Sequence, residues 1–409
     1  MTDAETVVVG AGHAGLAASW ALHERGLEHI VLEEGRIGQT WRDDRWSSFR
    51  LNTPRWMSRL PGQSAGGADA DGFDTAPEFA GALEAFRDEH RLPVTERAGP
   101  AAVVRDGSGR LRVDTPTMSI RARNVILATG FQQLVARPQA ARSLAPRLVQ
   151  LDTCTYRSAE GLPDGGVLVI GGGQSGCQIA EDLAAAGRRV MLATSRVGRI
   201  PRRYRGRDTL AWWTVSGFYE QRRSEVDPAV FDLRQPLLSG NDGGHSLSLQ
   251  SLARLGVALL GRLRGGDGEQ VQFGDELAEN VRFGDKVAAD LLRAIDEYIA
   301  GAAIEAERAI TDPADEPLAG LGEDAPRSLR LDRAGIGTVI WCTGMRPRLD
   351  AVGIPGVIHE GAVLHTDGVT PFDGLFAIGA PWLSMRKSGI IWGAPDDAEC
   401  IADLIARRR

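Results

Sequence analysis

Two glycine-rich stretches, each directly after an apolar run, constrain the fold of this chain more than any other feature. Each follows the pattern Gly-x-Gly-x-x-Gly and leads into a helix-forming run. The strand must turn into the helix so tightly that a pyrophosphate can touch backbone amides. The three glycines in turn make the bend, admit the phosphate and let helix and strand pack closely. The pattern predicts two dinucleotide-binding units, with glycines at Gly10, Gly12, Gly15, Gly171, Gly173 and Gly176.

The first copy reads as a complete βαβ unit. A helix-forming run continues to His23, Gly26 stops it, and a second strand, HIVLE, ends at Glu33. Glu33 follows Gly15 by 18 residues, close to the ~20-residue offset at which a carboxylate accepts hydrogen bonds from the ribose hydroxyls of a dinucleotide. We interpret Glu33 as a ribose ligand; the alternative is a solvated charge at the end of a strand.

The second copy differs at the end of its second strand. Its helix is expected to run to about Ala186, with Gly187 as its stop, and RRVMLATSR supplies the next strand. No acid follows, and Thr194, Ser195 and Arg196 stand there instead. A carboxylate at this place would repel a ribose 2′-phosphate, whereas a guanidinium would bind it. The second site is therefore predicted to take NADP rather than NAD, unless Arg196 is merely an exposed loop residue.

Length and charge narrow the class of protein. The 409 residues allow two or three domains, because single cores stop growing near ~250–300 residues. A net charge of −7 argues against a nucleic-acid partner. No apolar run approaches ~18 residues, so no membrane partner is expected. The four cysteines fall in no metal-like spacing and no basic-then-apolar leader opens the chain, so we expect no metal and a cytoplasmic protein.

The order of the motifs predicts an α/β fold with two Rossmann-like dinucleotide-binding domains. The run TVIWCTG in the last third of the chain mirrors the earlier NVILATG, as if each closed a nucleotide fold. We expect a discontinuous first dinucleotide-binding domain at residues 1–160 and 331–409, with the NADP-binding domain, residues 161–330, inserted in it. A partly helical insert is expected at about 204–305.

Two segments of the second half have more than one interpretation. The aromatic run with Trp212, Trp213, Phe218 and Tyr219 could form a lid or pocket wall, but core packing or a homodimer contact fits as well. The basic run PRRYRGR at residues 201–207 could bind phosphate beside the second nucleotide or could simply be solvated.

These landmarks together resemble the two-dinucleotide-binding flavoproteins, and most closely their flavin-containing monooxygenase-like branch. The likeness covers nearly the whole chain and rests on GAGHAG with Glu33, GQTW at 38–41, LATG, GGGQSG, CTG and the late stretch PWLSMRKSGIIWGAPDDA. It implies FAD in the first site and NADPH in the second. Trp41 would lie near the flavin, Asn52 of an Asn-Thr-Pro turn would face its reactive edge as the catalytic residue, and Arg196 would hold the 2′-phosphate. From its residues alone, Asn52 could equally be a turn residue before Pro54.

The residues expected to bind the two coenzymes lie on both glycine loops, on the strand ends beside them and on the GQTW segment. His13, inside the first loop, is expected to pack near the pyrophosphate rather than to act in catalysis. The full set is Gly10, Gly12, His13, Ala14, Gly15, Glu33, Glu34, Gln39, Thr40, Trp41, Thr129, Gly130, Gly171, Gly173, Gln174, Ser175, Gly176, Thr194, Ser195, Arg196, Thr343, Gly344 and Gly379.

The sequence also departs from the branch. Gln39 replaces the second of two glycines before Thr-Trp. In the fingerprint before the second nucleotide strand, Asp152 stands at the histidine position, and Pro146 and Leu148 stand at the phenylalanine and glycine positions. Tyr156 stands where the Baeyer–Villiger variant has tryptophan, so that variant is not expected.

The resemblance implies an FAD-dependent, NADPH-reduced monooxygenase that uses O2 and a flavin hydroperoxide to oxygenate N, S or C of a small organic substrate. The departures keep a second function open, an oxidase, dehydrogenase or reductase that inserts no oxygen. A non-catalytic redox sensor would need a protein-docking surface, for which the aromatic run is the candidate. A disulfide reductase is disfavoured because Cys154 and Cys177 are 23 residues apart and Cys177 sits in the NADP-binding helix.

Overall fold

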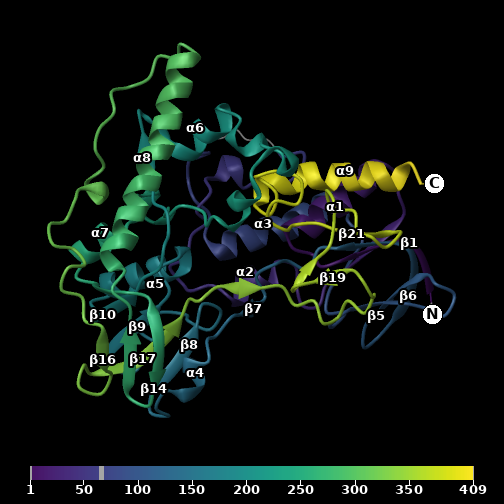
Figure 1. Ribbon diagram of the computed structural model, residues 1–409. Helices are drawn as coiled ribbons and strands as arrows, with labels where there is room; N and C mark the ends of the chain where they lie inside the picture. The colour runs from purple at the N-terminus through teal and green to yellow at the C-terminus, as the bar shows by residue number, and fades with distance from the viewer. Residues whose placement is uncertain (1, 64–68, 409) are drawn as a thin grey trace.

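The computed structural model describes residues 2–63 and 69–408, and it contains two main sheets side by side (Figure 1). The strands of the first sheet are β1 (Thr2–Val9), β2 (His29–Leu32), β3 (Val94–Thr95), β4 (Ala102–Arg105), β5 (Leu111–Asp114), β6 (Ser119–Leu127) and β21 (Leu375–Ala377). Their order is β3-β2-β1-β6-β5-β4, and β21 pairs with the second half of β6. Strands β1, β2, β3, β6 and β21 are parallel, whereas β4 and β5 form an antiparallel hairpin at one edge.

The second sheet is parallel throughout. Its strands are β8 (Val149–Asp152), β9 (Gly166–Ile170), β10 (Val190–Ala193), β13 (Ala258–Leu260) and β17 (Ile336–Trp341). Their order is β13-β10-β9-β17-β8. Every residue of β9 is buried, as expected for a central strand covered on both faces.

The end of the chain returns to the first sheet, so the first unit is built from two separate stretches. Helix α9 (Ala394–Ala406) packs along α1 (His13–Glu24), and both chain ends lie on the side of the first unit away from the second (Figure 1). Arg25 Nε donates to Asp403 Oδ1 at 2.7 Å across these two helices. Helix α3 (Ala76–His90) completes this layer and begins with a capping box between Thr75 and Glu78.

Sheet membership moves the unit boundaries away from the expected ones. Strands β8 and β17 lie outside residues 161–330 but belong to the second sheet. Within the expected insert, α7 (Leu249–Arg254) and β13 also return to that sheet. The reason is that parallel strands meet only through long crossovers, so neighbours in the sheet can be far apart in sequence. The division into two units stays a prediction, and sheet order favours about 149–341 for the second.

The rest of that stretch surrounds the second sheet. Helix α8 (Leu277–Gly301) lies above the second sheet in the view of Figure 1 and extends away from it. A small antiparallel sheet contains β14 (Leu263–Asp267), β15 (Gln270–Phe273) and β16 (Ser328–Arg330). The remaining described elements are α2 (Gln39–Asp43), α4 (Ala140–Ser143), α5 (Gln174–Ala185), α6 (Thr209–Val215), β7 (Leu134–Val135), β11 (Arg203–Tyr204), β12 (Arg207–Asp208), β18 (Met345–Arg346), β19 (Ile358–His359), β20 (Ala362–Val363) and 3-10 helices at Arg55–Met57, Phe218–Glu220, Arg223–Glu225, Pro228–Asp232, Asn241–Gly243, Pro313–Asp315 and Ile391–Gly393.

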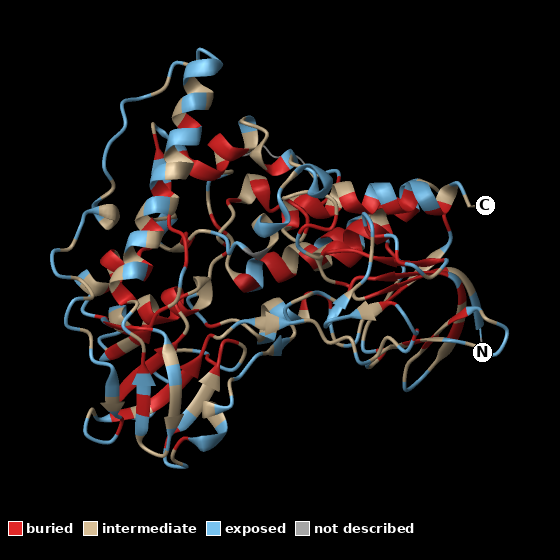
Figure 2. Ribbon diagram, viewed as in Figure 1, coloured by how far each residue is buried: buried red, intermediate tan, exposed pale blue. Residues whose placement is uncertain are grey.

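Buried residues concentrate on the two main sheets and the helices that cover them (Figure 2). The aromatic run forms a further cluster that packs on the inner side of α8. Trp212, Trp213 and Tyr219 are buried there, and Trp212 Nε1 donates to the carbonyl of Tyr204 at 2.7 Å. Packing is therefore the role of these three side chains, and they offer no lid or docking surface. Within the described ranges, no helix has both the length and the apolar character needed to cross a membrane.

Candidate functional site

The two glycine loops occupy equivalent places in their sheets. Gly10 N–H donates to the carbonyl of Leu32 at 2.8 Å, and Gly171 N–H donates to the carbonyl of Ala193 at 2.9 Å. Each loop thus leaves a central strand beside the end of the next strand of its own βαβ unit. This is the point at which open α/β sheets bind nucleotides, beyond the carboxyl ends of their strands.

The other neighbour of each loop is the turn after a returning strand. A Cβ on Gly10 would collide with the carbonyl oxygen of Ala128, and a Cβ on Gly171 with that of Cys342. Both glycines also have positive φ, +107° and +118°. The LATG and CTG motifs therefore close the two folds at matching positions, as their likeness in sequence indicates.

The remaining glycines of the loops have two different roles, helix packing and ligand access. A Cβ on Gly15 or Gly176 would overlap the carbonyl oxygen of Gly10 or Gly171, so these glycines let each helix pack on its strand. By contrast, a Cβ on Gly12 would meet nothing within 4 Å. The space in front of that loop fits a diphosphate that contacts the backbone and the N-terminus of α1.

Glu33 ties the end of β2 to the first glycine loop. Its Oε2 accepts from Ala11 N–H at 2.7 Å and its Oε1 accepts from Gly35 N–H at 3.0 Å. Burial raises the pKa of this carboxyl. The side chain is thus fixed at the loop edge where a ribose would lie, whereas Glu34 is exposed and pairs with Arg348.

His13 is the first residue of α1, and its Nε2 is buried without a hydrogen-bond partner among the described residues. Burial lowers the pKa of this imidazole to about 4, so it is neutral at neutral pH. An unpartnered polar atom at the glycine loop fits a bound group in front of it. Its assignment to packing near the pyrophosphate stays a prediction.

The GQTW segment lies against α3. Gly38 has φ +67° and precedes α2, and Gln39 Oε1 accepts from Arg36 N–H at 3.0 Å. Trp41 packs edge-on against Phe79, with ring centroids 5.0 Å apart, whereas Thr40 is exposed. The Gln39 side chain therefore bonds the turn before α2 and Asp43 at the end of that helix, where the related branch has glycine.

Three more predicted residues meet the loops from later parts of the chain. Gly379, two residues after the end of β21, packs against the start of α1, because a Cβ there would lie 2.9 Å from the Cβ of Ala14. Gly130 and Gly344 have φ of +83° and +97° in the two matching turns. Next to Gly344, Thr343 donates its hydroxyl to the carbonyl of Ala136 at 2.7 Å; Thr129, beside Gly130, is half-buried.

Asn52 is held by the second unit. Its Oδ1 accepts from Gln178 Nε2, on α5, at 3.0 Å, and its carbonyl accepts from Arg202 Nη1 at 2.7 Å. Arg202 is itself buried and paired with Asp208 at 2.6 Å. The basic run therefore does more than face solvent, because this arginine anchors the turn. Within the part of the chain that the structure describes, the Nδ2 of Asn52 donates to no other group.

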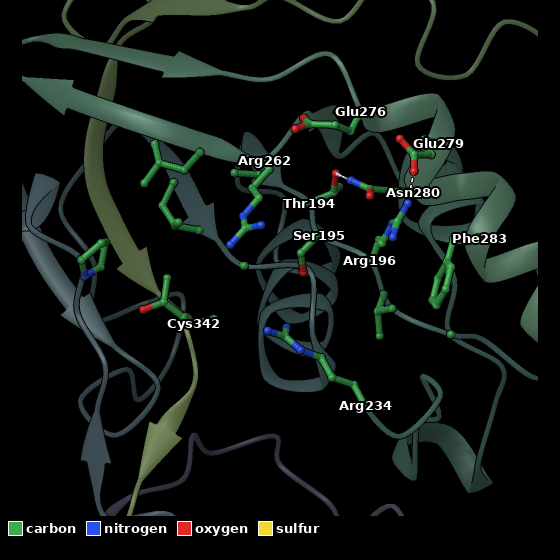
Figure 3. A pocket seen from close by; sticks show the side chains of 18 of the residues that line it. Thr194, Ser195, Arg196, Arg234, Arg262, Glu276, Glu279, Asn280, Phe283 and Cys342 are labelled. Atoms are coloured by element: carbon green, nitrogen blue, oxygen red, sulfur yellow. Dashed lines mark hydrogen bonds and ion pairs between the residues drawn. The ribbon is translucent and has the colours of Figure 1, made fainter. Parts of the chain in front are cut away.

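A cavity of about 820 Å³ opens at the carboxyl ends of β9, β10, β13 and β17 (Figure 3). It brings together part of the predicted second site, namely Gly171, Thr194, Ser195, Arg196 and Thr343. It also contains residues that sequence reasoning missed, among them Arg234, Arg262, Glu276, Glu279, Asn280 and Phe283.

Thr194 and Ser195 have different surroundings in this cavity. Thr194 is buried, donates its hydroxyl to the carbonyl of Leu260 at 2.7 Å and accepts from Asn280 Nδ2 at 3.0 Å. Its hydroxyl is therefore used within the protein. Ser195 Oγ is buried without a partner among the described residues, so, unlike the Thr194 hydroxyl, it is not used by another protein group there.

Guanidinium groups surround Ser195. Arg262 and Arg234 point towards it from two sides in Figure 3, and Arg234 Nη1 lies 3.5 Å from the position of a Cβ on Gly173. Such a cluster beside the second glycine fits the diphosphate of a dinucleotide. Arg262 follows β13 much as Arg196 follows β10, a signal hidden by the assignment of β13 to an insert.

Gln174 does not face this cavity. Its Oε1 accepts from Leu238 N–H at 3.2 Å and its amide donates back to the carbonyl of the same residue. The side chain thus fixes the neighbouring segment to the start of α5. Only the backbone of Gln174 remains a candidate for coenzyme binding. Ser175, the next residue, is half-buried in the first turn of α5.

The unusual fingerprint residues have structural roles. Asp152 Oδ2 accepts from Arg137 at 2.6 Å, and its Oδ1 accepts from the N–H groups of Cys154 at 3.0 Å and Thr155 at 3.1 Å. Tyr156 donates its hydroxyl to Asp182 at 2.5 Å. These contacts stabilise the turn after β8.

All four cysteines are free and none has an activated thiol. Burial raises the pKa of Cys154 to about 11 and that of Cys342 to about 12, and it also raises the pKa of Cys177 and Cys400. Because the thiolate is the reactive form, these environments oppose thiol–disulfide exchange.

Comparisons with known proteins agree with this geometry. Residues 7–227 match the family described as pyridine nucleotide-disulphide oxidoreductase. The "Uncharacterized oxidoreductase CzcO-like" of Geobacillus kaustophilus (strain HTA426) is 28% identical over 403 residues, covering 98% of each chain. The probable indole-3-pyruvate monooxygenase YUCCA8 of Arabidopsis thaliana is 27% identical over 214 residues, covering 50% of each chain.

Among solved structures, the flavin-containing monooxygenase from Stenotrophomonas maltophilia shares the fold. Its TM-score is 0.65 at 20% identity, and the match covers 100% of this chain and 99% of that one. The α/β fold class and the resemblance to the two-dinucleotide-binding flavoproteins are thereby confirmed.

Proposed function

Because this chain belongs to the pyridine nucleotide-disulphide oxidoreductase family, we propose that it is an FAD-dependent, NADPH-reduced monooxygenase of a small organic substrate. The fold shared with a flavin-containing monooxygenase and the likeness to a plant monooxygenase support this reaction type. The observation that carries it is the position of Asn52, which belongs to the first unit but is held by α5 of the second.

The first site fits FAD. The open face at Gly12 and the N-terminus of α1 would receive the diphosphate, and Glu33 would accept from the ribose hydroxyls. The unpartnered Nε2 of neutral His13 adds a polar group without adding charge. A neutral contact suits a position beside the phosphates better than a second charged side chain would.

The second site fits NADPH. Arg234 beside Gly173 and Arg262 across the cavity would bind the diphosphate, and Ser195 and Arg196 would contact the 2′-phosphate. No carboxylate directly follows β10, in contrast to Glu33 after β2. This difference is the reason for assigning the phosphorylated coenzyme to the second site.

When bound, the two coenzymes supply hydride transfer from nicotinamide to flavin and electron transfer from reduced flavin to O2. The chain's own residues position them. Gln178 holds the side-chain amide of Asn52 through its Oδ1, and Arg202 holds the backbone carbonyl, so that the amide Nδ2 would be left to donate to the reacting groups. A fixed donor in a water-poor site favours oxygen transfer to substrate over loss as H2O2.

Stopped-flow spectroscopy tests this proposal. The purified, flavin-loaded chain is reduced with NADPH without air and then mixed with O2. We expect bleaching by NADPH, followed by a transient absorbance distinct from both reduced and oxidised flavin. Direct return to oxidised flavin with stoichiometric H2O2 would contradict oxygen insertion.

An oxidase or dehydrogenase without oxygen insertion is the second candidate. It is favoured by Asp152, which stands at the branch's histidine position. Its carboxylate already accepts hydrogen bonds from Arg137 and from backbone N–H groups of the turn. The burial of Trp212, Trp213 and Tyr219 weakens the redox-sensor hypothesis, which depended on this aromatic run as a docking surface. The raised thiol pKa values oppose the thiolate chemistry that a disulfide reductase needs.

A further inference from the structure

One face of helix α8 forms a wall of the second nucleotide cavity. Glu276, Glu279, Asn280, Phe283 and Val287 all line it, at intervals that place them along one side of a helix. The helix therefore belongs to the coenzyme site, although it lies about 80 residues beyond β10 in the sequence.

This wall places a carboxylate where a 2′-phosphate is expected. Glu279 lies in the first turn of α8, and its carboxylate pairs with the guanidinium of Arg196 (Figure 3). Both side chains are largely exposed, 64% for Arg196 and 48% for Glu279, so the pair can open when a ligand arrives. The guanidinium predicted to bind the phosphate is thus already engaged.

The neighbouring acid is engaged elsewhere. Glu276, at the N-cap of α8, pairs with Arg264. Asn280 is neutral and holds Thr194. Among the charged residues of this wall, Glu279 is therefore the one that acts on Arg196.

We propose that Glu279 sets the coenzyme selectivity of the second site by competing with the ribose 2′-phosphate for Arg196. The inference rests on the proposed NADP assignment of this cavity. A 2′-phosphate must displace the carboxylate from Arg196 and then lie close to it, whereas a free 2′-hydroxyl can donate to it. The chain therefore binds NADPH less tightly than Arg196 alone would allow, and it retains affinity for NADH.

Calorimetric titration of the flavin-loaded chain with NADP⁺ and NAD⁺ tests this without any turnover. In Glu279→Gln we expect NADP⁺ to bind about fivefold more tightly and NAD⁺ about twofold more weakly, so that the selectivity ratio rises about tenfold. An unchanged ratio would overturn the proposal.

Asp290→Asn is the matched control. Asp290 lies on the same helix outside the cavity and pairs with Lys286 and Arg293, so its variant makes the same charge change. Its selectivity ratio is expected to stay within about twofold of the parent ratio. A tenfold rise in this variant as well would show that net charge, not competition for Arg196, governs selectivity.

The Arg196→Ala background separates competition from simple repulsion. There, Glu279→Gln is expected to change the ratio less than about twofold, because the shared partner is gone. An undiminished tenfold change would overturn competition for Arg196. If neither coenzyme bound any variant while FAD remained bound, the NADP assignment itself would fail, and the inference with it.

Discussion

The first glycine loop has a carboxylate at the end of its neighbouring strand, whereas the second has a cluster of guanidinium groups. Around Gly10 the structure places Glu33, bonded to the backbone of the loop itself. Around Gly171 it places Arg196, Arg234 and Arg262 from three separate segments. The backbone geometry of the two loops is nearly the same, down to the hydrogen bond from the first glycine to the adjacent strand.

This difference indicates that the glycine loop and the coenzyme selectivity of each site depend on different residues. The glycines create a place for a diphosphate, and they do so from local sequence. The identity of the nucleotide depends on side chains at the strand ends and on elements that arrive later in the chain, such as α8. The comparison can be tested at each of these levels.

The largest effects are expected from the packing glycines. In Gly15→Ala and Gly176→Ala the new Cβ would overlap a backbone carbonyl oxygen of the same loop. Each variant should lose about 3 kcal/mol of unfolding free energy, because backbone cannot move aside as a side chain can. Urea unfolding followed by circular dichroism measures the loss.

Gly12→Ala and Gly173→Ala are the matched controls. Both positions have extended backbone that alanine can adopt, and neither new Cβ would approach backbone. These variants should keep the parent's urea midpoint while G12A loses affinity for FAD and G173A for NADP⁺, each about tenfold or more. Equal unfolding of all four variants would remove the distinction between packing and access.

The ribose contact comes next. Glu33→Gln should weaken FAD binding by about 2 kcal/mol, roughly 30-fold in the dissociation constant, because a hydrogen bond to a charged acceptor is lost. The affinity of the flavin-loaded variant for NADP⁺ should not change. Fluorescence titration of the flavin-free chain gives the first constant. A loss shared between both coenzymes would break the assignment of this acid to one site.

The link between the units gives a smaller effect. Gln178→Leu removes the donor to Asn52 and should raise the H2O2 released per NADPH oxidised about fivefold. Gln150→Leu is the control. It also removes a hydrogen bond of a glutamine side chain, the one that Gln150 Oε1 accepts from Trp341 Nε1 at 2.9 Å within the second unit. If both variants released equal H2O2, loss of packing rather than Asn52 would be the cause.

The smallest effect contrasts two histidines. Burial lowers the pKa of His13, so the folded flavin-free chain binds a proton there less readily than the unfolded chain. Acidification from pH 7 to 5.5 should therefore lower its free energy of unfolding by about 1 kcal/mol through this group, a loss that His13→Gln should not show. A hydrogen bond with Glu181, at 2.8 Å, raises the pKa of His245. Its contribution of about 0.5 kcal/mol is present below pH 6.5 and disappears as the pH rises through the raised pKa, and His245→Gln removes it.

Urea midpoints at pH 5.5, 7 and 8.5 distinguish these signs. His13→Gln should flatten the acid side of the stability profile. His245→Gln should lower stability only on the acid side. The same direction of change in both variants would contradict the environments assigned to them.

Much of the fold could be predicted because the glycine pattern acts over short distances. The βαβ units, the turns at Gly26 and Gly187 and the equivalence of LATG and CTG depend on neighbouring residues. The limits of the second unit could not be placed, because β8 and β17 join its sheet from outside the expected range. Strand neighbours across a parallel sheet leave no local signal in sequence.

The site shows the same division. The position of Glu33 beside the first glycine loop could be predicted because its offset from Gly15 is fixed by one helix and one strand. Arg234 and Glu279 were missed because they reach the cavity from a loop and from a helix far along the chain. The bond between Asn52 and Gln178 joins residues 126 positions apart, so sequence placed each residue but not their contact.

We expect one chain to hold FAD at the first glycine loop and NADP at the second. A crystal structure of the chain with both coenzymes would show whether it does. We predict the FAD diphosphate against residues 10–15, with Glu33 on its ribose, and the NADP diphosphate between Gly173 and Arg234. A structure grown at saturating concentrations of both in which either loop held no nucleotide would contradict the account.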